Sequence, residues 1–448
     1  MDYSNFDLLF ASAPELYAAS LSVCALAYFL ILRKRIHSFF DPLFFNMVFT
    51  ICAAAVVPFL YFAQDIRGSY FAQFLVTELL FLFCMVAIPE PRATLRLSDQ
   101  ALISPSRRRF LQCLYLISAG VFVVSQLSAY AIGGIPLFHD SRLDYYSGGG
   151  GFGSLGRAVS MSSFFCWYLL IYRFVYQWRI GLWPKACDFG ILLVLLTSAV
   201  LSGSRSTFVS VLFLIFYFRL IHKRTPLYPK QQDARLAKGQ FITLIVASVG
   251  ALLVLSATSY ASGVGGAIYA FLFRMVMSGD VYFMAYPNDL LKSLNGGNPL
   301  LALFGGSLIA FRLIPPDMVP EPLGFQLFHS ATGMSGMFGP NPRHNVFGLV
   351  YFGCWGSIIY SAFLGALVGV VRNVGFRFVR IGGLSELIYV FAAVSVVSLN
   401  TSGDAFIGDM TNLVLIGCPM VAIAYIASHA LAIKIDHPQD EQLSSPTS

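Results

Sequence analysis

The stretch LFFNMVFTICAAAVVPFLYFA, residues 43–63, decides the fold class, because its 21 residues include no charged side chain. About 20 apolar residues are enough for a helix to cross the hydrocarbon core with every backbone amide paired internally. The whole chain has the same character: 57% of its 448 residues are apolar, 11% are charged, and the mean hydropathy is +0.71. Soluble domains carry about 25% charged residues. The sequence therefore predicts an all-α, polytopic helical membrane protein.

Ten further apolar runs resemble this one, which gives eleven expected transmembrane helices. They lie at 15–32, 43–63, 70–88, 110–132, 158–178, 186–201, 206–221, 240–258, 346–371, 384–400 and 411–432. The sixth and seventh are short and are separated only by Ser202–Arg205, so we expect a tight helical hairpin there.

The distribution of Lys and Arg predicts the orientation. Alternating the eleven helices places 21 of the 29 Lys and Arg on one face, and the positive-inside rule makes that face cytoplasmic. The N-terminus is then periplasmic and the C-terminus cytoplasmic. The outer face carries Arg67, Arg142, Arg157, Arg205, Arg274, Lys292, Arg312 and Arg343.

A long outer segment, 259–345, does not fit this simple count. It contains two interrupted apolar pieces, 266–286 and 299–314, which we interpret as amphipathic helices of an interfacial or re-entrant kind. If both crossed the membrane instead, the total would be thirteen. Residues 1–435 are expected to form one transmembrane domain, with a shorter outer loop at 133–157, and the polar tail 436–448 is expected to be disordered.

Several classes of function are not indicated. The formal charge of +7 is spread over short clusters, which gives no basic patch for nucleic acid. The eight cysteines show no CxxC spacing, and no Walker A loop or HExxH motif is present. Outer carboxylates could in principle bind a divalent cation, but they show no regular spacing. We therefore expect neither a cofactor nor a metal.

Arginines on the outer face are informative, since an arginine at mid-bilayer costs about 2.5–3.5 kcal/mol and needs a partner. A glycine-rich stretch at 148–151 follows Asp140 and Arg142, which suits an anionic, hydroxyl-rich ligand. The alternative is a mobile loop in which Arg142 pairs with Asp140 or Asp144.

In Ser202-Gly203-Ser204-Arg205-Ser206-Thr207 a capped helix start and a cation predict a phosphate site; the alternative is an arginine that reaches lipid headgroups.

A third group, Gly339-Pro340-Asn341-Pro342-Arg343-His344-Asn345, leads into an apolar helix. Histidine exchanges protons near neutral pH, so His344 is a candidate base, with His139 and His329 as competitors and a structural role as the alternative. The long loop adds Arg274, Asp280, Arg312 and Asp317. Glu78 lies in the middle of an apolar run and is either a functional residue or a satisfied interior one.

These residues resemble those of the Wzy-type O-antigen or repeat-unit polymerases and, more distantly, of the O-antigen ligases. The resemblance depends on four stretches and covers most of 110–432. They are Gly-Gly-Ile-Pro-Leu-Phe (133–138) ahead of Arg142, Ser-Gly-Ser-Arg-Ser (202–206), a long outer loop late in the chain, and Arg343-His344-Asn345 before a glycine-punctuated helix. The family's spacing of an arginine, ten residues and a glycine fits Arg142 with Gly153, and no comparable match starts at Arg205, Arg274, Arg312 or Arg343.

The resemblance implies a GT-C-like glycosyltransferase of the bacterial inner membrane. Such an enzyme transfers a growing glycan from undecaprenyl diphosphate to a new lipid-linked repeat unit on the periplasmic face. By resemblance, His344 activates the acceptor and Asn345 orients it. Arg205 and Arg343 bind the diphosphate, with Arg142, Arg274 and Arg312 as further candidates.

A retaining mechanism would add a carboxylate nucleophile, for which the acidic candidates are Asp280, Asp317 and Asp140. The family also implies a chain-length regulator and a flippase as partners. Two alternatives stay open. They are an O-antigen ligase, which differs in its acceptor, and a flippase or transporter, which predicts ionisable residues near the bilayer midplane.

Overall fold

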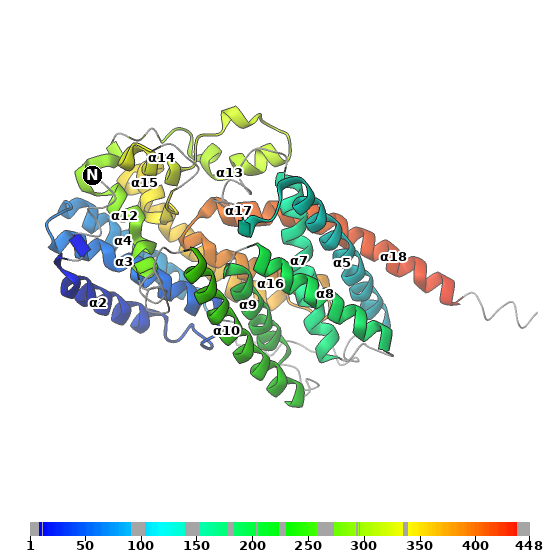
Figure 1. Ribbon diagram of the computed structural model, residues 1–448. Helices are drawn as coiled ribbons and strands as arrows, with labels where there is room; N and C mark the ends of the chain where they lie inside the picture. The colour runs from blue at the N-terminus through cyan, green and yellow to red at the C-terminus, as the bar shows by residue number, and fades with distance from the viewer. Residues whose placement is uncertain are drawn as a thin grey trace, which may run out of the picture. The chain divides into compact units, whose positions relative to one another are not determined.

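The computed structural model describes residues 9–10, 12–90, 104–138, 152–176, 182–202, 205–223, 230–258, 273–292, 294, 296–334 and 339–436 (Figure 1). This part of the chain is helical and contains no strand. Eight of its helices are long and apolar enough to cross a membrane, at Pro14–Leu32, Pro42–Phe62, Gly68–Ala87, Pro105–Gly133, Gly153–Val175, Pro184–Leu201, Arg343–Phe378 and Gly403–Leu431. The all-α prediction is confirmed for the described residues, and the eight apolar helices are compatible with a polytopic membrane protein.

The expected count of eleven is not reached by the described residues. Thr207–His222 and Leu384–Asn400 are helices at two expected positions, but both are shorter than the eight candidates. Pro299–Ala310, with 12 residues, is about 18 Å long at 1.5 Å per residue and cannot cross a core of about 30 Å by itself. The orientation of the termini stays a prediction.

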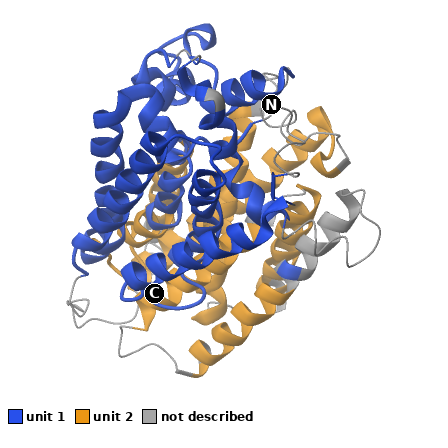
Figure 2. Cartoon of the chain, turned by 90° about the vertical axis from the view of Figure 1, so that its left-hand side faces the viewer, with its two compact units in different colours: residues 1–92, 246–377, 392–411 blue, residues 93–245, 378–391, 412–448 orange. Residues whose placement is uncertain are grey.

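Contacts divide the chain into two compact units (Figure 2). Unit 1 comprises Met1–Arg92, Val246–Arg377 and Ala392–Thr411, and unit 2 the rest. The helices of unit 1 include α2 (Pro14–Leu32), α3 (Pro42–Phe62), α4 (Gly68–Ala87), α12 (Asp280–Ala285), α13 (Pro299–Ala310), α14 (Leu323–Thr332), α15 (Arg343–Gly369), η2 (Met277–Gly279) and η7 (Val396–Asn400). Those lying wholly or mainly in unit 2 include α5 (Pro105–Gly133), α7 (Phe152–Val175), α8 (Leu182–Leu201), α9 (Arg205–His222), α10 (Lys230–Thr258), α16 (Leu384–Ser395) and α18 (Cys418–Asp436), while α17 (Gly403–Asn412) lies at the boundary. The expectation of a single domain over 1–435 stays a prediction.

The second part of α15 packs closely and in parallel against α4. A Cβ added at Gly365 would lie 2.1 Å from the carbonyl oxygen of Phe81, and one at Gly369 would lie 2.7 Å from that of Met85. Only glycine permits this backbone approach. Further toward the start of both helices, Gln73 Nε2 donates to Ser357 Oγ at 3.1 Å.

The chain reverses direction at Gly353, whose φ of +68° interrupts α15. His344 Nδ1 lies 2.9 Å from Ser361 Oγ although the residues are 17 apart in the sequence, and the rings of Phe347 and Tyr360 are stacked at 5.5 Å. Residues 343–352 therefore form a short arm antiparallel to the rest of α15. We name these ten residues the re-entrant arm.

The expected helix at 346–371 coincides with the candidate span Arg343–Phe378, but the reversal at Gly353 shows that it is not one continuous helix. Its first seven residues belong to the re-entrant arm, and only the part after Gly353 runs along α4. The physical reason is the left-handed backbone of Gly353, which hydropathy does not register because the residues on both sides of the turn are equally apolar.

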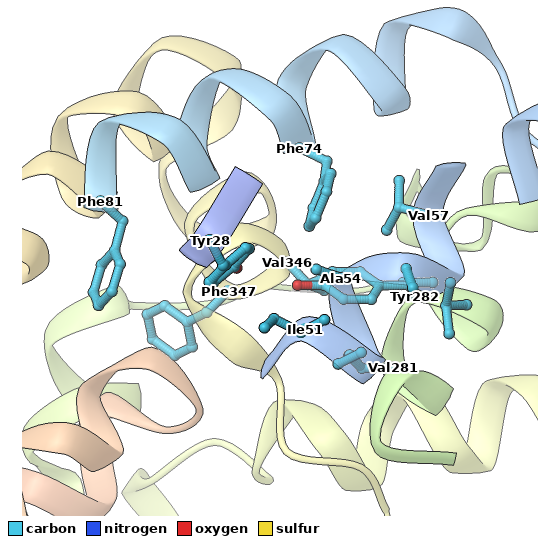
Figure 3. Close-up of a cluster of buried hydrophobic side chains, with 14 of the residues drawn as sticks. Tyr28, Ile51, Ala54, Val57, Phe74, Phe81, Val281, Tyr282, Val346 and Phe347 are labelled. Atoms are coloured by element: carbon cyan, nitrogen blue, oxygen red, sulfur yellow. The ribbon is translucent and has the colours of Figure 1, made fainter. Parts of the chain in front are cut away.

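The segment before α12 also reaches the middle of a helix. Ser278 Oγ donates to the carbonyl of Phe49 at 3.2 Å, and Gly279 is so close to α3 that an added Cβ would lie 2.8 Å from the carbonyl of Ala53. The described part of the apolar piece 266–286 thus packs against the centre of α3. Figure 3 shows Val281 and Tyr282 of this segment beside Ile51, Ala54 and Val57.

Candidate functional site

A buried polar cluster lies in the apolar interior of unit 1. At its centre is Glu78, near the middle of α4 and 5% exposed. Its carboxylate accepts hydrogen bonds from the hydroxyl of Tyr28 and from Asn345 Nδ2, the latter at 2.9 Å. We call Tyr28, Glu78, Tyr282, His344 and Asn345 the Glu78 cluster. A buried carboxylate needs such donors, since an unpaired one would neutralise itself.

His344, the second residue of the re-entrant arm, is enclosed by protein. Its side chain has no exposed surface, and its Nε2 lies 3.2 Å from Glu78 Oε2. This is ion-pair distance, although Nε2 lacks hydrogen-bond alignment. Nδ1 contacts Ser361 Oγ at 2.9 Å, and the ring stacks on Phe81 at 4.6 Å. Both ring nitrogens therefore already face a protein partner.

Asn345 connects three helices through its amide. Nδ2 donates to Thr77 Oγ1 at 3.1 Å as well as to Glu78, and Oδ1 accepts the hydroxyl of Tyr282 at 2.7 Å. The backbone carbonyl of Asn345 accepts Gln73 Nε2 at 3.2 Å. The amide is saturated, so its first effect is to fix the arm against α4 and α12.

Arg343 directly precedes His344 and Asn345 and has different hydrogen-bond partners from both. It is 4% exposed, and its φ of +45° is a left-handed conformation that costs a non-glycine residue about 1–3 kcal/mol. Its N–H donates to the carbonyl of Thr401 at 3.0 Å, and Nη2 donates to that of Ser278 at 3.1 Å. Within the described part of the chain, that is the one hydrogen bond of its guanidinium, and no carboxylate lies within ion-pair distance.

Asp280 begins α12 beside this arginine. Oδ1 accepts the N–H of Val281 at 2.8 Å. Burial raises the pKa of Asp280 from 3.8 to about 6, against the lowering effects of that hydrogen bond and of the positive charges of Arg343 and Arg274. Asp280 lies outside the eight candidate spans. Its carboxyl group can exchange a proton near neutral pH, as a general acid or base must.

The structure brings four of the predicted residues together: Asp280, Arg343, His344 and Asn345. Arg274, Arg312 and Asp317 belong to unit 1, but their side chains are exposed. Arg312 occupies a turn with φ of +58°. Asp140 and Arg142 lie outside the described residues. The backbone of Arg205 starts α9 in unit 2, its side chain is not described, and its shared role with Arg343 stays a prediction.

Several partners in the Glu78 cluster were not foreseen from the sequence. Tyr28, Thr77, Tyr282 and Ser361 are ordinary members of apolar or mixed runs, and nothing in their spacing marks them. The residue that indicates this cluster in the sequence is Glu78, because a single carboxylate in an apolar helix requires hydrogen-bond donors from other elements. Within the described ranges, no three His, Cys, Asp or Glu side chains form an arrangement that could hold a metal ion.

A second buried carboxylate lies in unit 2. Glu386 accepts the hydroxyls of Tyr168 and Tyr172, both at 2.5 Å, and the N–H of Gly382 at 2.8 Å. His222 Nε2 lies 3.0 Å from its Oε1. Both oxygens are satisfied by α7, α9 and the residues around α16, so this group joins helices and leaves no donor for a ligand.

No known family model, curated protein sequence or solved structure matches this chain.

Proposed function

We propose that the protein is a membrane glycosyltransferase that joins lipid-linked oligosaccharide repeat units, with Arg343 binding the diphosphate of the donor. The observation that carries this proposal is the buried guanidinium of Arg343, which makes one hydrogen bond to the described residues of the protein. A planar guanidinium suits phosphate oxygens. The sequence resemblance to repeat-unit polymerases supplies the substrate class, an oligosaccharide on undecaprenyl diphosphate.

The reaction is a displacement at the anomeric carbon. The acceptor hydroxyl oxygen forms a bond to this carbon as the bond to the diphosphate oxygen breaks, and the diphosphate leaves with the electron pair. Arg343 stabilises the negative charge that develops on it. The hydroxyl proton passes to a base, and an inverting displacement needs only one.

We assign the base to Asp280. Its raised pKa, about 6, leaves a fraction of each protonation state near neutrality, whereas His344 has a partner at each ring nitrogen. The role first expected of His344, acceptor activation, is the alternative within the same site. It requires the ring to leave either Glu78 or Ser361.

We further propose that the site opens on the periplasmic side of the bacterial inner membrane. The excess of Lys and Arg on the opposite face supports this orientation. A ligase that transfers finished glycan to a lipid core would use the same chemistry, so the identity of the acceptor separates these two enzymes.

Two observations favour a second candidate, a transporter of lipid-linked sugars. The carboxylate of Glu78 lies near the middle of α4, with Nε2 of His344 at 3.2 Å, and the re-entrant arm is separated from the rest of α15 by the non-helical Gly353. Both features are typical of transporter sites. Activity of the purified protein separates the candidates, because a transporter forms no glycosidic bond.

The test is polymerisation by the full chain, purified and reconstituted with undecaprenyl-diphosphate-linked repeat units. We expect a ladder of products from the wild type and single units alone from Arg343→Ala. Normal product length with Arg343→Ala would refute the site. Transbilayer movement of substrate without any product would support transport instead.

A further inference from the structure

Glu78 is the one carboxylate of the Glu78 cluster, and it contacts residues that lie far from it in the sequence. Its partners on α15, His344 and Asn345, directly follow Arg343. Three consecutive residues of one short arm are therefore fixed relative to α4 whenever the last two bind Glu78. The arm has no other charged partner on α4 among the described residues.

The conformation of Arg343 requires such an external restraint. Its φ of +45° is unfavourable for an isolated arginine, and its N–H is held by Thr401. Two sets of contacts support this backbone. Arg343 itself donates to the carbonyls of Thr401 and Ser278, and the two residues after it, His344 and Asn345, contact Glu78.

The Glu78 carboxylate has its partners within the Glu78 cluster and forms no ion pair with Arg343. Glu78 faces His344 at 3.2 Å and receives Tyr28 and Asn345. The hydrogen bonds of its carboxylate thus lie within the cluster, while the guanidinium of Arg343 makes its one hydrogen bond among the described residues to a backbone carbonyl. A carboxylate that reached Arg343 would compete with a phosphate for the same donors.

We propose that Glu78 is a positioning residue for diphosphate binding: by binding His344 and Asn345 it holds the re-entrant arm where Arg343 can contact the phosphate oxygens. This inference rests on the proposed function. It assigns Glu78 no contact with substrate, so Glu78 acts entirely through Arg343.

The experiment measures the Kd of farnesyl diphosphate, a short polyprenyl diphosphate, for the full chain in lipid nanodiscs. We expect Arg343→Ala to raise Kd at least tenfold and Glu78→Gln about tenfold. Glu78→Asp keeps the charge and should give an intermediate loss of about threefold. In the Arg343→Ala background, Glu78→Gln should change Kd no further, because coupled residues are not additive.

Glu386→Gln is the matched control, since it neutralises a buried carboxylate that, like Glu78, faces a histidine and accepts hydrogen bonds from tyrosine hydroxyls, here two of them. It should bind the probe as the wild type does. If Glu78→Gln and Glu386→Gln weaken binding of farnesyl diphosphate equally, the loss is due to general destabilisation, and the inference is overturned. An unchanged Kd with Glu78→Gln would also overturn it, and so would an additional tenfold loss in the Arg343→Ala background.

Failure of the proposed function has a different signature. If Arg343→Ala binds farnesyl diphosphate as the wild type does, the diphosphate site itself is wrong. If Arg343→Ala loses binding and Glu78→Gln does not, the site stands and only the positioning role of Glu78 falls.

Discussion

Asp280→Asn should stabilise the protein at neutral pH while abolishing transfer activity. The folded state raises the pKa of Asp280 from 3.8 to about 6, so it disfavours the carboxylate and favours the protonated acid. For a group whose pKa is raised by folding, the stabilisation is complete below the unfolded value of 3.8 and is lost as the pH rises through about 6. The wild type therefore carries a disfavoured charge at pH 7.5.

The size of the effect follows from the same values. At about 1.36 kcal/mol per pH unit, the interval from 3.8 to about 6 corresponds to about 3 kcal/mol. Solvent contact of the half-buried carboxyl reduces this to about 1–3 kcal/mol, because partly exposed charges are screened. An uncharged asparagine of similar shape avoids this cost at every pH.

Thermal unfolding in detergent at several pH values provides the measurement. The Tm of Asp280→Asn should exceed that of the wild type at pH 7.5, and the difference should shrink as the pH falls below 6. Asp317→Asn, at an exposed carboxylate, should show no such trend. The reasoning fails if Asp280→Asn is no more stable than the wild type at pH 7.5, or if its advantage is the same at pH 5.

Three further outcomes are expected. Gly365→Val should sharply reduce folded protein, because even a Cβ there would lie 2.1 Å from the backbone of Phe81, whereas Gly306→Ala, with nothing within 4 Å, should be neutral; size-exclusion profiles of both variants check this. Gly353→Ala should cost about 1–3 kcal/mol, because φ of +68° with ψ of −173° is a backbone region that essentially only glycine adopts; this is measured as a lower Tm, and an unchanged Tm would argue against the reversal. Arg343→Lys should lose most polymer on gels of surface polysaccharide, since a point charge does not replace a planar fork, and full-length polymer in this variant would mean that charge alone suffices.

The helical class could be predicted from the sequence because it depends on local composition. An apolar run such as 43–63 indicates a helix of membrane-spanning length by its own composition, and α3 is observed there, at Pro42–Phe62. The reversal at Gly353 could not be predicted, since its signal is a dihedral angle within a continuous apolar run. Hydropathy gives the total apolar length and not the direction of the chain.

The candidate site was predicted in part, for a related reason. Arg343, His344 and Asn345 stand out as polar residues before an apolar run, and Glu78 stands out inside one. Their meeting could not be read from either stretch, because 267 residues separate Glu78 from Asn345. Nor could the different partners of these residues be predicted: His344 and Asn345 contact Glu78, whereas the guanidinium of Arg343 makes its one hydrogen bond within the described residues to the carbonyl of Ser278.

The separation between Glu78 and Asn345 also constrains how the molecule is made. Ribosomes add about 5–20 residues per second, so the 267 residues between them take about 13–53 s to synthesise. During this interval α4 has emerged with a lone acid, for which Tyr28 is the one cluster partner already translated. The surroundings of the carboxylate are therefore completed only after the N-terminal helices have been translated, and a nascent chain truncated before residue 343 should be a preferred target of membrane quality-control proteases.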